Sequence, residues 1–198
     1  MEMSSKTEIT RADILPLEEF AKIRKTKRQE LVGIKKNRRV EVGPVATFYF
    51  ENYATMWWQI HEMLFIEKGG DDQIPDELAA YNPLIPKGRE LVSTVMFEID
   101  EPVRRANFLA KLGGVEETAF LEFAGERIAG IPEADVDRTS AEGKASSVQF
   151  IHFPFTDEQV RKFRAPGTQV TIGFRHPQYA HMTIVSEEVR IALAEDFR

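Results

Sequence analysis

The sequence predicts a single α+β domain in which a largely antiparallel sheet packs against several helices. Its 198 residues, 42% of them hydrophobic, are enough to form one sizeable core. The strand-like segments are short and follow one another across turns, which is typical of antiparallel pairing. Helical and strand-like segments are mixed without a regular strand–helix–strand alternation, and this favours α+β over α/β.

The first half of the chain is expected to supply most of the helix. Residues 1–11 are expected to form a frayed end, followed by a helix over 14–36 with apolar residues at helical spacing. Residues 40–50 alternate like a strand that Gly43-Pro44 interrupts. A second helix is predicted over 51–67, with Asn52 as its cap, and the acidic segment 71–77 is predicted to be a loop.

The second half predicts mainly short strands. These are expected over 91–99, 115–124, 126–131, 147–155, 169–175 and 181–185. Further helices are predicted over 102–112 and after the caps Thr156 and Ser186. The polar segment 132–146 is expected to be a mobile loop, and the pair His176-Pro177 is expected to lie in a loop. All of these elements are assigned to one domain spanning 1–198.

Composition excludes several classes of function. The chain has no cysteine, so disulfides, thiolate metal sites, iron–sulfur ligation and cysteine nucleophiles are excluded. No apolar run approaches the ~18 residues of a membrane span, and the start of the chain has no apolar signal core. No phosphate loop, dinucleotide fingerprint or serine elbow is present. The expectation is a cytoplasmic protein without a membrane partner, and the sequence decides neither its oligomeric state nor whether it is an enzyme.

Charge is distributed unevenly along the chain. The net charge is −6, yet nine cations and one acid lie between Lys22 and Arg39. Such a segment can bind nucleic acid, or it can form a solvated helix face whose cations pair with acids elsewhere. The pI of 5.4 and the absence of a nucleic-acid motif favour the second interpretation.

The predicted helix 51–67 carries one narrow polar stripe on an otherwise apolar surface. Glu51, Asn52, Gln59 and Glu62 share this stripe. A helix that is apolar nearly all round is usually buried, and buried carboxylates require cations, a metal or a proton. The stripe therefore either forms the wall of a pocket, with the two glutamates as metal ligands or acid–base groups, or it faces water.

A metal site is one specific form of the pocket interpretation. His176 and His181 flank a turn and can converge on one ion, for which Glu51 and Glu62 are the candidate carboxylate ligands. Nitrogen and oxygen ligands without sulfur suit iron, manganese or zinc. The alternative is that both histidines are loop residues bonded to backbone. The pair His61-Glu62 begins a zinc-protease motif, but its second histidine is absent, so that chemistry is excluded.

A third group of polar residues precedes the strand 91–99. Asn82, Arg89 and Glu90 are candidate pocket residues. Arg89 can bind an anion at the strand entrance, or it can form a structural ion pair with an acid such as Glu62. The second role is the simpler interpretation.

Three strings in the chain carry a family resemblance. They are KKNRRVEVGPVATFYFENYATMWWQIHEML, YNPLIPKGREL and GFRHPQYAH. With these the chain resembles the bacterial domain-of-unknown-function family 3501 over most of its length. The matching positions are Arg38, Arg39, Glu51, Asn52, Gln59, Glu62, Met63, Asn82, Pro86, Gly88, Arg89, Glu90, His176 and Pro177. His152 lies in surroundings less typical of that family, which makes it a poorer site candidate.

The resemblance implies a biological setting and no activity. Members of the family look like companions of rubrerythrin-type and iron–sulfur proteins in bacterial genomes, which implies a redox or oxidative-stress setting. The leading expectation is thus an accessory or binding protein of such a pathway, with a protein of that pathway as partner. The alternatives are a metal-binding protein or metal-dependent enzyme that uses Glu51, Glu62 and His176 or His181, and a nucleic-acid-binding protein that uses the segment from Lys22 to Arg39.

Overall fold

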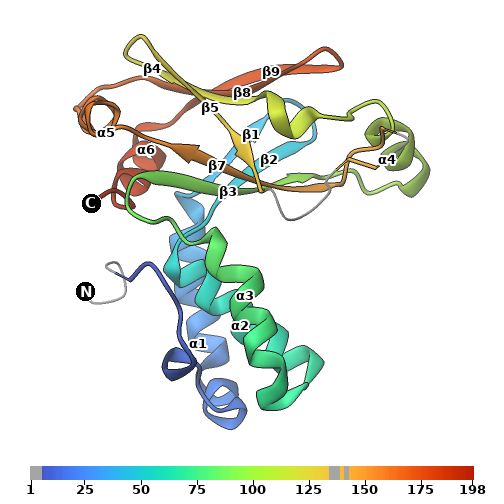
Figure 1. The fold of residues 1–198 in the computed structure, drawn as a ribbon, viewed down its shortest axis with the longest axis vertical. Helices are drawn as coiled ribbons and strands as arrows, with labels where there is room; N and C mark the ends of the chain where they lie inside the picture. Colours follow the sequence, from blue (N-terminus) through green and yellow to red (C-terminus); the bar gives the residue numbers. More distant parts are fainter. Residues whose placement is uncertain (1–5, 134–138, 141–142) are drawn as a thin grey trace.

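Two antiparallel sheets and a group of N-terminal helices make up the fold (Figure 1). A computed structural model of the chain describes residues 6–133, 139–140 and 143–198. Helices α1 to α3 project together from one side of the sheets, whereas α5 and α6 lie side by side near one end of them (Figure 1). The predicted α+β class and the antiparallel sheet are confirmed.

The described residues form six α-helices that are interspersed among short strands. The helices are α1 (Leu17–Lys36), α2 (Tyr53–Glu67), α3 (Ile74–Tyr81), α4 (Pro102–Leu109), α5 (Asp157–Arg164) and α6 (Glu187–Ala194), with 3-10 turns η2 (Arg11–Asp13), η3 (Gly70–Gln73), η4 (Asn82–Leu84) and η5 (Val115–Thr118). The first sheet has the order β1-β2-β3-β7-β6, formed by β1 (Arg39–Val42), β2 (Ala46–Phe50), β3 (Glu90–Phe97), β7 (Val148–Pro154) and β6 (Ile131–Pro132). The second sheet has the order β5-β4-β8-β9, formed by β5 (Glu126–Ala129), β4 (Ala119–Phe123), β8 (Val170–His176) and β9 (Tyr179–Val185).

The two sheets share a core of aromatic side chains. Phe48 of β2 and Phe174 of β8 pack with their ring centroids 5.0 Å apart, and Phe97 lies 6.0 Å from Phe174. Along β3 successive side chains face opposite sides, so Leu91 enters this core while Val92 enters a second core under the helices. The first sheet is thus covered on both faces, which explains its nearly continuous apolar runs.

Strand β1 of the first sheet and strand β9 of the second are tied together. The Thr183 hydroxyl donates to the Glu41 carbonyl at 2.8 Å, and the Tyr179 hydroxyl donates to the Val42 carbonyl at 2.7 Å. Gly43 follows with a φ of 67°, and an added Cβ there would lie 2.7 Å from the Tyr179 hydroxyl oxygen. Glycine is therefore required at this turn, which divides the predicted strand 40–50 into β1 and β2.

The N-terminal segment is docked where the sequence predicts a frayed end. Ile9 is 1% exposed, and its backbone N–H and carbonyl bind the side-chain amide of Asn82 at 2.8 and 2.9 Å. Residues 1–5 of the predicted frayed end lie outside the described residues. The docking explains why Asn82 is needed, since its amide satisfies both backbone groups of a buried residue.

The second difference from prediction is the acidic segment 71–77, which is helical in η3 and α3. Pro75 stands in the first turn of α3 together with Asp76 and Glu77, a combination that favours a helix start. The expected loop 132–146 begins with the last residue of β6 and contains a bridge between Thr139 and Ala145, whereas 134–138 and 141–142 lie outside the described residues. His176 ends β8 instead of lying in a loop.

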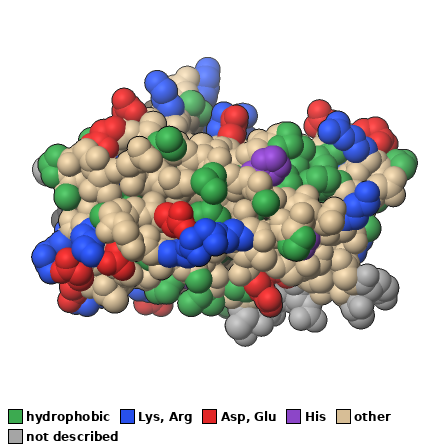
Figure 2. Space-filling view, turned by 90° about the horizontal axis from the view of Figure 1, so that it is seen from above, with side chains coloured by type: hydrophobic (Ala, Val, Ile, Leu, Met, Phe, Trp, Pro, Cys, Tyr) green, Lys and Arg blue, Asp and Glu red, His purple; other side chains and the backbone are tan. Residues whose placement is uncertain are grey.

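The outer face of the second sheet mixes side chains of every kind. Met182 and Ile184 of β9 are each 63% exposed there. Basic and acidic side chains are interspersed with apolar ones on the face that Figure 2 shows. In the part of the chain that the structure describes, no helix is long and apolar enough to span a membrane.

Candidate functional site

A cleft of about 500 Å³ lies between the helical part of the molecule and the C-terminal segment. Its walls come from α1, the start of α2, the pair Ile85-Pro86, the end of α6 and the residues after α6. The volume falls within the range of about 300–1,000 Å³ that is typical of small-molecule sites. The lining is mixed: apolar and aromatic side chains occur beside charged ones.

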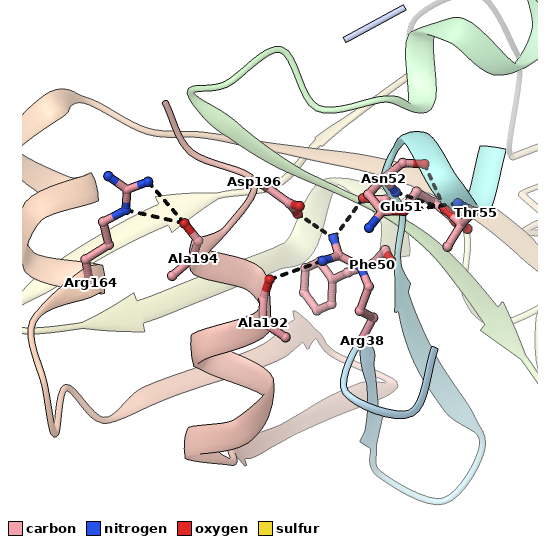
Figure 3. Close-up of polar contacts among 9 residues, drawn as sticks. All are labelled: Arg38, Phe50, Glu51, Asn52, Thr55, Arg164, Ala192, Ala194 and Asp196. Carbon is pink, nitrogen blue, oxygen red and sulfur yellow. Dashed lines mark hydrogen bonds and ion pairs between the residues drawn. The ribbon is translucent and has the colours of Figure 1, made fainter. Parts of the chain in front are cut away.

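Arg38 and Asp196 form a buried ion pair that belongs to the wall of this cleft (Figure 3). The Arg38 side chain is 4% exposed and donates to three carbonyls, those of Phe50 and Glu51 at 3.0 Å and that of Ala192 at 3.2 Å. Burial raises the pKa of the Asp196 carboxyl, and the Arg38 guanidinium opposes that rise. One guanidinium thereby joins the end of β2 to the end of α6, which sets the relative position of two cleft walls.

The N-terminus of α2 opens on the same cleft. Asn52 caps the helix, because its side-chain oxygen accepts from the Thr55 N–H at 3.0 Å while the Thr55 hydroxyl accepts from the Asn52 N–H at 2.9 Å. The next two N–H groups, of Tyr53 and Ala54, have no hydrogen-bond partner among the described residues. The first turn of α2 also contains no acid. This end of the helix therefore has a positive potential that no acid in its first turn offsets.

Both tryptophans of the chain line the cleft. The Trp57 indole N–H donates to the Asp13 carbonyl at 2.9 Å. Trp58 is 8% exposed and packs on Phe20 with a centroid separation of 5.5 Å. Its indole N–H has no partner within the described residues and is not sealed from solvent. Tyr53 adds a third aromatic ring to the lining.

The two glutamates of the predicted polar stripe bind different residues of the fold. Glu51 precedes the helix, is 7% exposed and accepts a hydrogen bond from the Thr94 hydroxyl at 2.7 Å. Glu62 forms a two-point ion pair with Arg24 of α1 at 2.6 and 2.8 Å. The structure thus gives Glu62 a partner other than the predicted Arg89, which pairs with Asp157.

The remaining predicted pocket residues lie at separate places, except that Arg89 and Glu90 both line a second, smaller pocket of about 280 Å³. Gln59 lies beside Tyr81, and Asn82 holds the N-terminal segment as described above. Asn52 lines the cleft, whereas Glu51, Gln59, Glu62, Asn82, Arg89 and Glu90 do not. Of the four residues in the predicted stripe, Asn52 is therefore the one that lines this cleft.

The expected metal ligands do not converge. His176 bonds the Gly113 carbonyl through Nε2 at 3.1 Å and accepts from the Gln178 N–H at its Nδ1 at 3.2 Å. His181 is an exposed residue of β9 beside Tyr179, and both glutamates have the partners given above. Among residues 6–133, 139–140 and 143–198, no group of three or more histidine, aspartate or glutamate side chains is placed to hold a metal ion.

The basic segment from Lys22 to Arg39 lies mainly on α1. Four of its nine cations form ion pairs: Arg24 with Glu62, Lys27 with Glu30, Arg38 with Asp196 and Arg39 with Glu41. Arg24 and Lys27 belong to α1, whereas Arg38 follows that helix and is buried. The nucleic-acid alternative stays a prediction, which a gel-shift titration with random DNA at low salt tests.

A cluster that the sequence did not predict surrounds His152 on the first sheet. Its Nδ1 lies 2.9 Å from a Glu90 oxygen and its Nε2 lies 3.1 Å from a Glu133 oxygen. Val92 of β3 and Ile131 of β6 both stand opposite His152, so each glutamate is two residues away along a neighbouring strand and on the same face. The hydrogen bond to Glu90 raises the pKa of His152, burial opposes the rise, and Glu133 adds to it.

This cluster is expected to stabilise the folded protein more at low pH than at high pH. Because the pKa of His152 is raised above its usual 6.5, the imidazolium stabilises the fold below pH 6.5, and that contribution is lost as the pH rises through the raised pKa. We expect His152→Gln to be less stable than wild type by up to about 1 kcal/mol at pH 5.5, with the difference shrinking at pH 9. Urea unfolding at both pH values measures it, and a difference that grows with pH would contradict the assignment.

Comparison with known proteins gives a family and a solved structure. The model of the family described as "Protein of unknown function (DUF3501)" matches residues 8–197. A crystal structure of a novel protein of unknown function from Burkholderia pseudomallei K96243 is 36% identical, with a TM-score of 0.89 over 96% of this chain and 99% of that one. No curated protein matches the chain.

Proposed function

Since the chain belongs to the protein family of unknown function DUF3501, we propose its function from the geometry of the cleft: it is a binding protein that holds a small organic molecule there. The observation that carries this proposal is the placement of Tyr53, Trp57 and Trp58 in one cleft with the buried Arg38–Asp196 pair. Aromatic rings supply apolar contact area, and fixed polar groups orient a ligand.

The cleft also has the rigidity that a binding site requires. Trp58 is held from behind by Phe20, and Arg38 is fixed by three carbonyls and one carboxylate. Side chains held in this way lose little conformational freedom when a ligand arrives, so more of the contact energy appears as affinity. An accessory role in a redox pathway is compatible with such a protein, but that setting is supported only by the family resemblance.

Gly33 offers a way to fill the cleft without disturbing the fold. It lies in α1, lines the cleft, and a Cβ added to it would meet no atom within 4 Å. We expect Gly33→Met to raise the free energy of unfolding by about 0.5–1 kcal/mol, since glycine is a poor residue inside a helix. The same substitution is expected to obstruct ligand binding, because the new side chain occupies the cleft. Urea unfolding measures the first effect.

The binding test compares this variant with a matched control. Val32 is the preceding residue of α1, is 66% exposed and does not line the cleft, so Val32→Met adds the same side chain on another face. In a thermal-shift screen of small organic molecules, we expect compounds that raise the Tm of wild type and Val32→Met but not that of Gly33→Met. Compounds that stabilise all three proteins equally would show that binding occurs elsewhere and would overturn the proposed function.

A further inference from the structure

We propose that the molecule held in the cleft is a monocarboxylate with an apolar or aromatic body, whose carboxylate binds at the N-terminus of α2. This inference rests on the proposed function and names the chemical class of its ligand. Three features of the described residues carry it: two free backbone donors, one side-chain donor without a partner on a largely buried tryptophan, and the balance of charge around them.

The free donors are the N–H groups of Tyr53 and Ala54. Asn52 and Thr55 bond each other in the capping box, and the Met56 N–H donates to the Asn52 carbonyl at 3.1 Å, so the cap itself is complete. The two N–H groups that remain belong to residues lining the cleft. Two adjacent backbone donors at a helix start match the two oxygens of a carboxylate, and the helix dipole favours the negative charge.

Trp58 supplies an independent indication of a ligand. Its side chain is more than nine-tenths buried, yet the indole N–H has no partner among the described residues. Trp58 stands one helical turn after Ala54 on the same face of α2, and long helical side chains lean toward the N-terminus. Trp58 thus lies on the same face of α2 as Ala54, and Tyr53, Ala54 and Trp58 all line the cleft. The indole N–H is open to solvent and Trp58 lines the cleft, so a ligand oxygen there can accept a hydrogen bond from it.

The charges around the cleft favour a single negative charge on the ligand. Lys6 pairs with Asp13 at 2.5 Å, Lys27 pairs with Glu30 at 2.7 Å, and Arg38 pairs with Asp196. These cations are already matched by acids, whereas the helix N-terminus is equivalent to about half a positive charge. Glu195 and Arg198 also line the cleft, and their opposite charges add no net charge to it. A carboxylate is thus better matched than a phosphate monoester.

Ala54 allows the charge requirement to be tested separately from folding. An aspartate in the first turn of α2 interacts favourably with the helix dipole, so Ala54→Asp is expected to keep or raise the Tm. The aspartate carboxylate also occupies the N-terminus of α2, where the ligand carboxylate is proposed to bind. We therefore expect it to weaken binding of the ligand about tenfold or more. Ala54→Asn has nearly the same size without the charge, and we expect it to bind within about twofold of wild type.

The readout is the fluorescence of the full chain, because its two tryptophans both line the cleft. The probes are phenylacetate, 3-phenylpropionate and hexanoate, each compared with its primary amide and with phenyl phosphate. We expect saturable changes with the carboxylates, at affinities about tenfold or more above those of the amides. The Ala54→Asp variant should lose this preference and Ala54→Asn should keep it.

The outcomes separate this inference from the proposed function. Amides that bind as well as carboxylates, or phenyl phosphate that binds more tightly, would overturn the monocarboxylate class while leaving a functional cleft. Equal losses in Ala54→Asp and Ala54→Asn would show that size, and not charge, matters at this position. No saturable change with any carboxylate overturns the inference, and the Gly33→Met and Val32→Met comparison then decides the proposed function on its own.

Discussion

Replacing Arg38 by alanine is expected to lower the free energy of unfolding by about 3–5 kcal/mol. The substitution leaves the Asp196 carboxylate, whose side chain is 8% exposed, without its cation. It also removes the donors to the carbonyls of Phe50, Glu51 and Ala192. An uncompensated buried charge together with unsatisfied carbonyls is among the most destabilising changes in a folded protein. Urea unfolding at pH 7 measures the loss.

The control for this experiment removes both charges. The double variant Arg38→Met with Asp196→Leu is expected to recover a large part of the lost stability, because apolar residues of similar volume often replace a buried ion pair at little cost. The matched surface control is Arg39→Ala, since Arg39 pairs with Glu41 while 53% exposed and should change stability by less than about 1 kcal/mol. If Arg38→Ala behaved like Arg39→Ala, the ion pair would not be the link between β2 and α6.

Replacing Phe20 by alanine is expected to cost a similar 3–5 kcal/mol. Phe20 is 1% exposed and forms the contact between α1 and α2, with its ring 5.5 Å from Trp58 and 4.9 Å from the His61 ring. Its removal leaves a cavity behind Trp58, so the tryptophan emission should also change in the folded variant. Thermal unfolding and the emission spectrum together measure both effects.

An exposed residue of the same helix gives the reference for Phe20. Leu17 is 43% exposed, and Leu17→Ala should change stability by much less, within about 0.5 kcal/mol. A Phe20→Ala variant that kept wild-type stability would mean that α1 does not depend on this contact. The cleft would then lack the rigid rear support on which the proposed function relies.

The fold was predictable because it depends on patterns local to the chain. Alternating residues such as those of β7, and turn residues such as Gly43, identify short strands directly from the sequence. The second helix was predicted from its apolar circumference, and burial of Ile60 and Trp58 on opposite sides confirms that it lies inside the fold. The loop prediction for the acidic segment 71–77 is wrong, because Pro75, Asp76 and Glu77 are residues that favour the first turn of a helix.

The site was less predictable because its ion pairs join residues that are far apart in the sequence and meet only in the folded chain. Glu62 and Arg24 are 38 residues apart, and Arg38 and Asp196 are 158 residues apart, so no spacing rule connects either pair. Asn52 was identified as a cap, and that single assignment leads directly to the cleft. The cluster around His152 could be found only with the strand register. Val92 stands opposite His152, so Glu90, two residues earlier on β3, lies on the same face and next to the histidine.

The link between β1 and β9 bears on how the protein behaves at high concentration. A strand at the end of a sheet offers unpaired backbone groups to other chains, and this is a common route to aggregation. Here the Thr183 and Tyr179 hydroxyls of β9 occupy the carbonyls of Glu41 and Val42 on β1, so each of these two end strands shields the other. Two hydroxyls of β9 thus keep two carbonyls at the β1 end of the first sheet from pairing with another chain.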